Sequence, residues 1–397
     1  MNKTTSVREN HVDALRGFAL LGIVIVNSGA MASAWYGSGA MAPAFSAPLD
    51  QWVRGLIAAL FETKFYLLFS FLFGYSFTLQ MASAAREGAD FMPRFLRRLA
   101  GLAIFGLVHA VFLFQGDILF TYSLLGAALL CLRGIAPRTA LKLALGLWLF
   151  TMLAWAALAA LSSLAPQTMD VAALNAQASA ATAAYQGSPQ AVIGQHVRDI
   201  EQGIALVLLL IQAPCAFACF LLGFAAGQSG FLNRLAADPL RLCRAFFRML
   251  VPGLLGALAY VYLERQATTE HQALFALAID LATAPFLSAA WALALLWSFH
   301  TARGARLEAA LAPAGRHALT HYLGQSLIGA LIFTGWGAGQ IGLWSPLAIL
   351  ALAGAVWLLQ VVLSRFWVSR FAYGPAEWLL RSLTLWRRPR WRLQAAS

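Results

Sequence analysis

Long apolar runs, separated by short basic or polar segments, make up most of the chain. Most runs reach the roughly 20 residues that a helix needs to cross a membrane. They are continuous and do not alternate, which argues against a membrane β-barrel. The pattern therefore predicts an all-α polytopic membrane bundle of about ten transmembrane helices. The predicted spans are residues 15–34, 60–82, 98–115, 118–133, 139–161, 203–227, 246–263, 273–300, 317–336 and 346–365.

The third and fourth runs form one apolar stretch, residues 98–133, that is too long for a single crossing. Gly116-Asp117 interrupts it, so we expect a hairpin whose outer turn is Gln115 to Asp117. His109 precedes that turn by six residues, which places it about 9 Å deep at the helical rise. An ionisable group at that depth is costly and indicates a functional site. The alternative is a packing histidine that bonds a neighbouring hydroxyl or carbonyl group.

Composition and charge placement agree with a membrane protein. Of the 397 residues, 60% are hydrophobic and only 11% are charged, whereas soluble domains carry about 25% charged residues. With the N-terminus inside, all but four of the 28 lysines and arginines fall on the cytoplasmic side, the exceptions being Arg54, Lys64, Arg198 and Arg265. This positive-inside pattern predicts that both termini are cytoplasmic. It also explains the net charge of +12 without a nucleic-acid partner.

The chain divides into an N-terminal membrane half, residues 1–230, and a C-terminal membrane half, residues 231–397. In the first half, the long external loop from Ser162 to Gln202 is interpreted as a spacer with a surface helix near residues 172–185. In the second, aromatic and apolar residues recur at helical spacing between Phe371 and Trp386, and arginines follow them. That tail predicts an amphipathic helix on the anionic inner leaflet.

Polar residues in the first span form one stripe. Asp13 and Arg16 are three residues apart and therefore neighbours on a helix. Asn27 follows Arg16 by 11 residues, which returns it to nearly the same face. We expect this stripe to face the bundle. The alternative is an ion pair at the helix end plus one packing amide.

Two further groups of polar residues are predicted to share a depth. In the outer half of the membrane these are Glu62, Lys64, His109, Asp117 and Asp280. At the inner face, His317, His321 and Gln325 are each four residues apart and form a second stripe, at the level of Arg16, Arg97, Arg98 and Arg316. Arginines at this level either clamp phosphate groups bidentately or only satisfy the positive-inside rule. The pattern does not say whether the outer residues converge laterally.

Five motifs resemble those of the YeiB-like family of bacterial inner-membrane proteins, whose C-terminal half is a domain of unknown function. In chain order they are HVDALRGFALLGIVIVN, FETKFYLLFSFLFGYSF, GLVHAVFLFQGDILFTYSLLG, GRHALTHYLGQSLIGALIF and FAYGPAEWLLRSLT. The match covers nearly the whole chain and implies a multi-pass protein of the bacterial cytoplasmic membrane. The opening Asp-x-x-Arg-Gly also resembles the first helix of a superfamily of integral-membrane acyltransferases, which includes sugar O-acetyltransferases.

The acyltransferase resemblance implies transfer of an acyl group from cytoplasmic acyl-CoA to a lipid, glycan or small periplasmic acceptor. It implies that His109 is the general base or acyl carrier, oriented by Asp117 or Glu62. Arg16, with Arg97 and Arg98, would hold the CoA phosphates. Superfamily members of known chemistry place their histidine in or near the first outer loop or second helix, whereas residues 28–61 here contain none. No metal and no permanently bound cofactor are expected.

Three functional hypotheses remain open at this point. The first is the acyltransferase, which accounts for polar residues at both depths. The second is a proton-coupled transporter or exporter of a small molecule, with Asp280, Glu62 and His109 along the pathway. Its helices would be interrupted at Pro214, Pro252 and Pro285. The third is a structural membrane protein whose polar groups only pack helices. The sequence favours the acyltransferase over the transporter and does not determine the oligomeric state.

Overall fold

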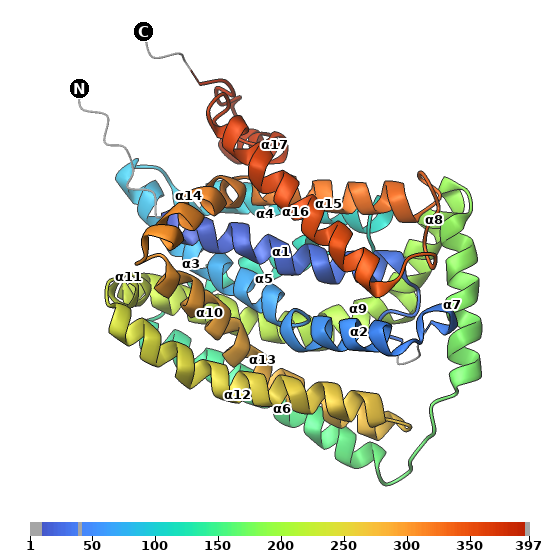
Figure 1. Ribbon diagram of the computed structural model, residues 1–397. Coiled ribbons are helices and arrows are strands. Elements are labelled where there is room, and N and C mark those ends of the chain that lie inside the picture. Colours follow the sequence, from blue (N-terminus) through green and yellow to red (C-terminus); the bar gives the residue numbers. More distant parts are fainter. Residues whose placement is uncertain (1–9, 39–41, 394–397) are drawn as a thin grey trace.

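The computed structural model describes residues 10–38 and 42–393, and these residues form helices without a β-sheet (Figure 1). Eight helical stretches are long and apolar enough to cross a membrane, and two shorter apolar helices accompany them. This confirms the predicted all-α polytopic bundle. The helices are α1 (Asn10–Ala32), α2 (Pro48–Leu60), α3 (Lys64–Arg86), α4 (Phe91–Phe112), α5 (Leu119–Cys131), α6 (Pro137–Ser162), α7 (Val171–Gln186), α8 (Pro189–Asp199), α9 (Ala205–Val207), α10 (Ala213–Ser229), α11 (Phe231–Ala236), α12 (Pro239–Gln266), α13 (Glu270–Ser298), α14 (Ala302–Arg316), α15 (Ala318–Phe333), α16 (Pro346–Val368) and α17 (Pro375–Leu385), with short helical segments η1 (Pro43–Phe45), η2 (Ile200–Ile204) and η3 (Leu208–Gln212).

The two ends of the bundle are distinct. The start of α1, together with α11 and α14, lies at one end, and α7 and α8 lie at the other (Figure 1). The described chain therefore begins at the first of these ends. We call it the inner end, following the positive-inside prediction, and call the opposite one the outer end.

The predicted α4–α5 hairpin is present, but its turn is not at the protein surface. Phe114 and Asp117 in the turn are buried, at 4% and 2% exposure. The His196 ring of α8 donates a hydrogen bond from Nδ1 to the carbonyl oxygen of Val111, at 2.9 Å. The segment interpreted as a spacer thus contains the expected surface helix, α7, and also a second helix that covers the turn. With 13 residues, α5 is about 20 Å long, which is less than the hydrocarbon layer of about 30 Å.

An interrupted crossing lies between α2 and α3, at the start of the predicted span 60–82. The helix stops at Leu60 and starts again at Lys64. Between them Thr63 has a φ of 66°, a left-handed conformation that is uncommon for a β-branched residue. Pro252 and Pro285 are not breaks, because they lie inside the continuous helices α12 and α13. Pro214 lies in the first turn of α10, directly after the π-helical segment η3.

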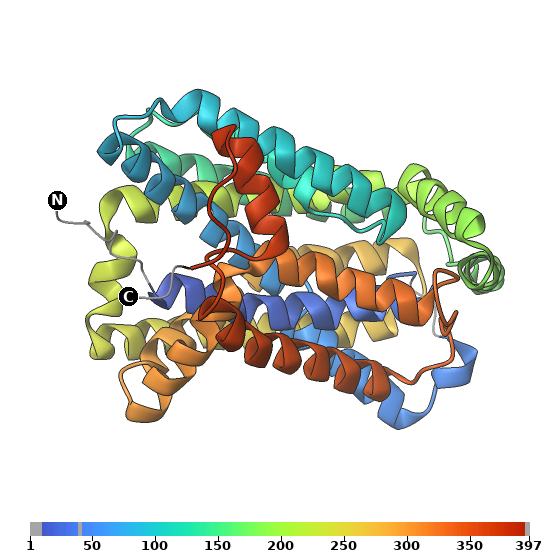
Figure 2. The same cartoon turned by 90° about the horizontal axis from the view of Figure 1, so that it is seen from above.

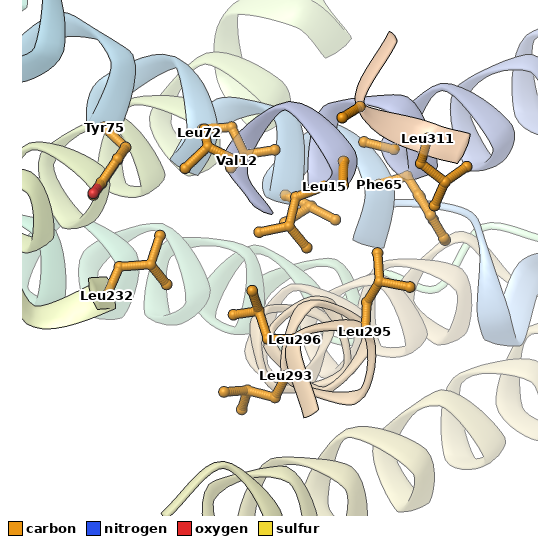
Figure 3. Packing of buried hydrophobic residues seen from close by; sticks show 14 of the residues in the cluster. Val12, Leu15, Phe65, Leu72, Tyr75, Leu232, Leu293, Leu295, Leu296 and Leu311 are labelled. Carbon is orange, nitrogen blue, oxygen red and sulfur yellow. The ribbon is translucent and has the colours of Figure 1, made fainter. Parts of the chain in front are cut away.

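The centre of the bundle is formed around α1. Figure 3 shows Val12 and Leu15 of α1 among apolar side chains of α3, α13 and α14. Close approach of α14 depends on Gly315, because a Cβ atom there would lie 1.7 Å from the Asp13 carbonyl oxygen. Such small-residue contacts let membrane helices pack backbone against backbone. Since α14 to α16 belong to the C-terminal half and α1 to the N-terminal half, the two halves share one core.

The C-terminal helix α17 does not simply lie on a membrane surface. Figure 2 shows it crossing over the bundle, and it packs against α4 and α15. Leu380 is buried at 3% exposure, directly over Gly101 of α4. Leu379 and Trp386 stay exposed, at 46% and 76%, so one edge of the predicted amphipathic helix is free to contact lipid.

Candidate functional site

His109 and Asp117 form a buried pair at the α4–α5 turn. The His109 Nδ1 atom lies 2.8 Å from Asp117 Oδ1, and the backbone N–H of Phe120 donates to Asp117 Oδ2, also at 2.8 Å. Both side chains are nearly inaccessible, at 0% and 2% exposure. The carboxylate accepts a hydrogen bond from Nδ1–H, so Nε2 is left as the acceptor atom of the imidazole. Nε2 has no hydrogen-bond partner among the described residues.

Local sequence explains this geometry. Gly106 lies one helical turn before His109, and a Cβ atom there would be 2.3 Å from Phe120 N and 2.7 Å from Asp117 Oδ2. Only glycine lets the start of α5 approach α4 this closely. His109 is therefore paired with Asp117, one of the two carboxylates expected to orient its ring, and a glycine in the motif makes the pairing possible.

A cavity of about 530 Å³ extends along the bundle beside this pair. Its inner mouth carries the charged residues Arg16, Arg98, Arg316, Glu377 and Arg381. Its deep end carries Asn27, Thr63, Gly116 and Gln212, and aromatic side chains of α3 and α5 line the middle. Tyr322 lines the cavity too, and its ring centre is 4.9 Å from that of His109. His109 thus lies directly behind one wall of the cavity.

The other outer-level residues form a separate ion-pair cluster. Lys64 Nζ donates to Asp280 Oδ1 at 2.7 Å and to the Ala58 carbonyl at 3.1 Å. The second carboxylate oxygen of Asp280 accepts from Thr63 Oγ1 at 2.6 Å. Both charged side chains are buried, at 0% and 2% exposure. The cluster ties the α2–α3 break to α13, and only Thr63 of the group lines the cavity.

Glu62 is not the residue that orients His109. It accepts a hydrogen bond from the Tyr36 hydroxyl at 2.5 Å. Burial raises the pKa of the Tyr36 phenol well above its ordinary value, and the adjacent Glu62 carboxylate raises it further. Of the two carboxylates expected to orient the imidazole, Asp117 does so.

The polar stripe of the first span faces the bundle as predicted. Arg16 Nη1 donates to Asp13 Oδ1 at 2.7 Å, and its other amino group bonds the Ser76 hydroxyl. Arg316 Nε lies 3.6 Å from Asp13 Oδ2. Arg16 and Asn27 both line the cavity.

The inner stripe of α15 does not line the cavity and packs against another helix. His321 Nε2 is 2.6 Å from the Ser364 hydroxyl, and Gln325 donates to the Gln360 side chain at 2.7 Å. Both partners belong to α16, so this stripe joins two helices. His317 is buried at 3% exposure. Neither these three residues nor Arg97 is among the described residues that line the cavity, whereas Arg98 is.

Two residues of α17 at the mouth were not singled out by the sequence patterns. The Glu377 carboxylate accepts from the backbone N–H groups of Leu319 and Thr320, at 2.7 and 3.0 Å, and from the Thr320 hydroxyl at 2.5 Å. It thereby caps α15, where a negative charge is favourable. Burial raises the pKa of the Glu377 carboxyl above its ordinary value. The signal in the sequence was an acidic residue in a basic tail, followed four residues later by Arg381.

Comparison with known proteins places the chain in a family. Residues 226–387 match a family described as "Protein of unknown function (DUF418)". The protein YxaH of Bacillus subtilis (strain 168) is 31% identical, over 96% of this chain and 95% of that protein. YeiB of Escherichia coli (strain K12) is 28% identical, over 94% and 95%. A 39.9 kDa protein of Bacillus acidopullulyticus is also 28% identical, over 94% and 92%. The chain therefore belongs to the YeiB-like family, whose C-terminal part is the DUF418 region.

Proposed function

We propose that this protein is an integral-membrane acyltransferase. It takes an acyl group from cytoplasmic acyl-CoA and transfers it to a hydroxyl of a lipid, glycan or small-molecule acceptor, in the bacterial cytoplasmic membrane. The observation that carries the proposal is the buried His109–Asp117 pair, in which His109 Nε2 bonds no described residue. A histidine held in one tautomer by a carboxylate, with its other nitrogen free, is arranged as a general base.

The cavity supports a donor that enters from the inner end. Four arginines at the mouth favour an anionic molecule, and the aromatic middle section favours an apolar chain. The deep end lies beside the α4–α5 turn, where Gly116 is part of the lining. A thioester that reaches this level would lie next to Tyr322, the residue between the cavity and His109. Rotation of that ring would bring Nε2 into contact with the cavity.

The proposed reaction moves one proton in a closed sequence. His109 Nε2 takes the proton of the acceptor hydroxyl while the hydroxyl oxygen forms a bond to the thioester carbonyl carbon. The carbon–sulfur bond then breaks, and the imidazolium gives the proton to the departing CoA thiolate. Asp117 stays ionised and stabilises the imidazolium through the Nδ1 hydrogen bond. The products are the acylated acceptor and free CoA.

The direct test measures release of free CoA from acetyl-CoA and palmitoyl-CoA by the purified protein in nanodiscs. Chromatography is used for detection, because Cys131 is an exposed thiol that would consume a thiol reagent. We expect His109→Gln to lower the rate by about 10²-fold or more, in line with loss of a general base. His300→Gln is the matched control, since His300 is exposed in an inner loop, where its ring forms a hydrogen bond with the Ala236 carbonyl at 2.9 Å. Absence of His109-dependent CoA release with bacterial lipid extracts as acceptor would refute the proposal.

A second candidate, the proton-coupled transporter, rests on a different observation. Lys64 and Asp280 form a buried ion pair at an interrupted crossing. Ionisable pairs within the membrane occur along proton and substrate pathways. A flux assay distinguishes the transporter from the acyltransferase. The same purified protein is reconstituted into liposomes that contain a pH-sensitive dye. A proton flux abolished by Asp280→Asn and unaffected by His109→Gln would favour the transporter.

A further inference from the structure

We propose that Arg98 of α4 and Arg381 of α17 form an anion site for a phosphate group at the inner mouth. A second cavity of about 150 Å³ adjoins the main one there. The two cavities share four lining residues, namely Gln80, Ser83, Arg98 and Arg381. One ligand can therefore extend from the small cavity into the large one past both guanidinium groups.

The charges around the two cavities are unequally paired. Arg16 and Arg316 both face the single carboxylate of Asp13. Arg94, which lines the small cavity, bonds Glu87 at 2.7 Å. These pairs leave two of the five cavity arginines to account for.

Arg98 and Arg381 have no carboxylate within 4.0 Å among the described residues. The Nε atom of Arg98 is buried, and no residue that the structure describes forms a hydrogen bond with it. The Arg381 guanidinium lies over the Tyr373 ring, 5.0 Å from its centre. The nearby Glu377 is already used, because both of its oxygens accept hydrogen bonds at the start of α15.

A buried donor without a partner is costly, and neighbouring positive charges increase that cost. The charges of Arg16 and Arg381 both repel that of Arg98, and the attraction of Glu377 is smaller than either repulsion. An anion between Arg98 and Arg381 would remove this penalty. Two guanidinium groups suit phosphate in particular, because each can donate two parallel hydrogen bonds to its oxygens.

The position of α17 makes the second arginine available. Glu377 joins α17 to the start of α15, and Leu380 fits over Gly101 of α4. Arg381 is the next residue, and it is exposed at the mouth, so an anion can reach it from the inner solution. The C-terminal helix thereby acts as one wall of the site.

The shared chemistry is a phosphate ester, which occurs both in a nucleotide-type donor such as acyl-CoA and in a phospholipid headgroup. The inference deepens the proposed function, in which the donor is phosphorylated, but the anion site itself does not require acyl transfer.

The experiment measures binding of inorganic pyrophosphate to the full-length protein in detergent, by calorimetry at constant ionic strength. We expect Arg98→Gln and Arg381→Gln each to raise the Kd at least tenfold. Arg244→Gln and Arg388→Gln, exposed residues of α12 and of the tail, should change it less than twofold. Arg98→Lys, which keeps the charge and loses the paired donors, should give an intermediate Kd. Equal binding by all variants, or no binding by the wild type, would overturn the inference.

Competition then identifies the source of the phosphate. Displacement of pyrophosphate by CoA and not by dihexanoyl phosphatidic acid supports a soluble donor at this site, and the reverse supports a lipid headgroup there. The outcome is independent of the proposed chemistry, because His109→Gln should bind pyrophosphate normally. Arginine-dependent binding without any CoA release would refute acyl transfer and leave the anion site standing.

Discussion

The buried ion pair between Lys64 and Asp280 leads to a quantitative prediction about stability. In Asp280→Leu, the Lys64 ammonium stays buried at 0% exposure, with the neutral Ala58 carbonyl as its remaining hydrogen-bond acceptor at 3.1 Å. Removal of one partner from a buried pair costs about 3–5 kcal/mol, because it leaves an uncompensated charge. We expect the same range for Lys64→Met. Replacement of both, in Lys64→Met/Asp280→Leu, removes the charges together and should cost about 2 kcal/mol or less.

The assay is reversible unfolding in mixed micelles, with a double-mutant cycle over the four proteins. The cycle should give a coupling of at least about 4 kcal/mol, far above the 0.3–0.5 kcal/mol error of additivity for independent sites. Thr63 Oγ1 also bonds Asp280, so Thr63→Val controls for loss of the neutral hydrogen bond and should cost about 1 kcal/mol. Additive single effects, each below about 1 kcal/mol, would refute the reasoning. The double variant also has a functional use, since an acyltransferase should keep CoA release and a transporter that depends on this pair should lose transport.

Three further predictions concern other contacts. Gly315→Val places a side chain against the Asp13 carbonyl, 1.7 Å from the new Cβ, and should destabilise the protein by about 3 kcal/mol or more. The control Gly354→Val meets open space and should not have this effect. Similar unfolding curves for the two variants in micelles would contradict the prediction. Asp117→Asn should lower CoA release but bind acyl-CoA as tightly as the wild type, because the variant loses only the His109 tautomer. An unchanged pH–rate profile would contradict this role of Asp117. The raised pKa of Glu377 means that folding favours its protonated form. Its contribution to stability is therefore present below the ordinary value of 4.5 and is lost as pH rises through the raised folded value. The thermal midpoint of the wild type should fall relative to that of Glu377→Gln over this interval, and parallel pH curves for the two proteins would contradict the prediction.

The sequence by itself determined the fold class and the hairpin, and the family resemblance named Asp117 as one of two carboxylates that could orient His109. Fold class follows from apolar run length, because a helix is the one way for a single segment to satisfy its backbone hydrogen bonds in lipid. The pair was accessible for a local reason. His109 and Asp117 are eight residues apart on the two sides of a tight turn, so the turn alone brings them together. The stripe from Asp13 to Asn27 was likewise predictable, since helical periodicity decides which residues share a face.

Only the tertiary structure decided which partner each face meets. Periodicity put His321 and Gln325 on one face, but the neighbour of that face is α16 and not the cavity. Lys64 and Asp280 are 216 residues apart, and depth in the membrane does not determine lateral position, so their pairing required the packed bundle. The same holds for α17, which a basic amphipathic pattern assigned to the membrane surface. Its place over the mouth depends on Glu377 meeting the start of α15 and on Leu380 meeting Gly101, contacts between segments that no local pattern relates.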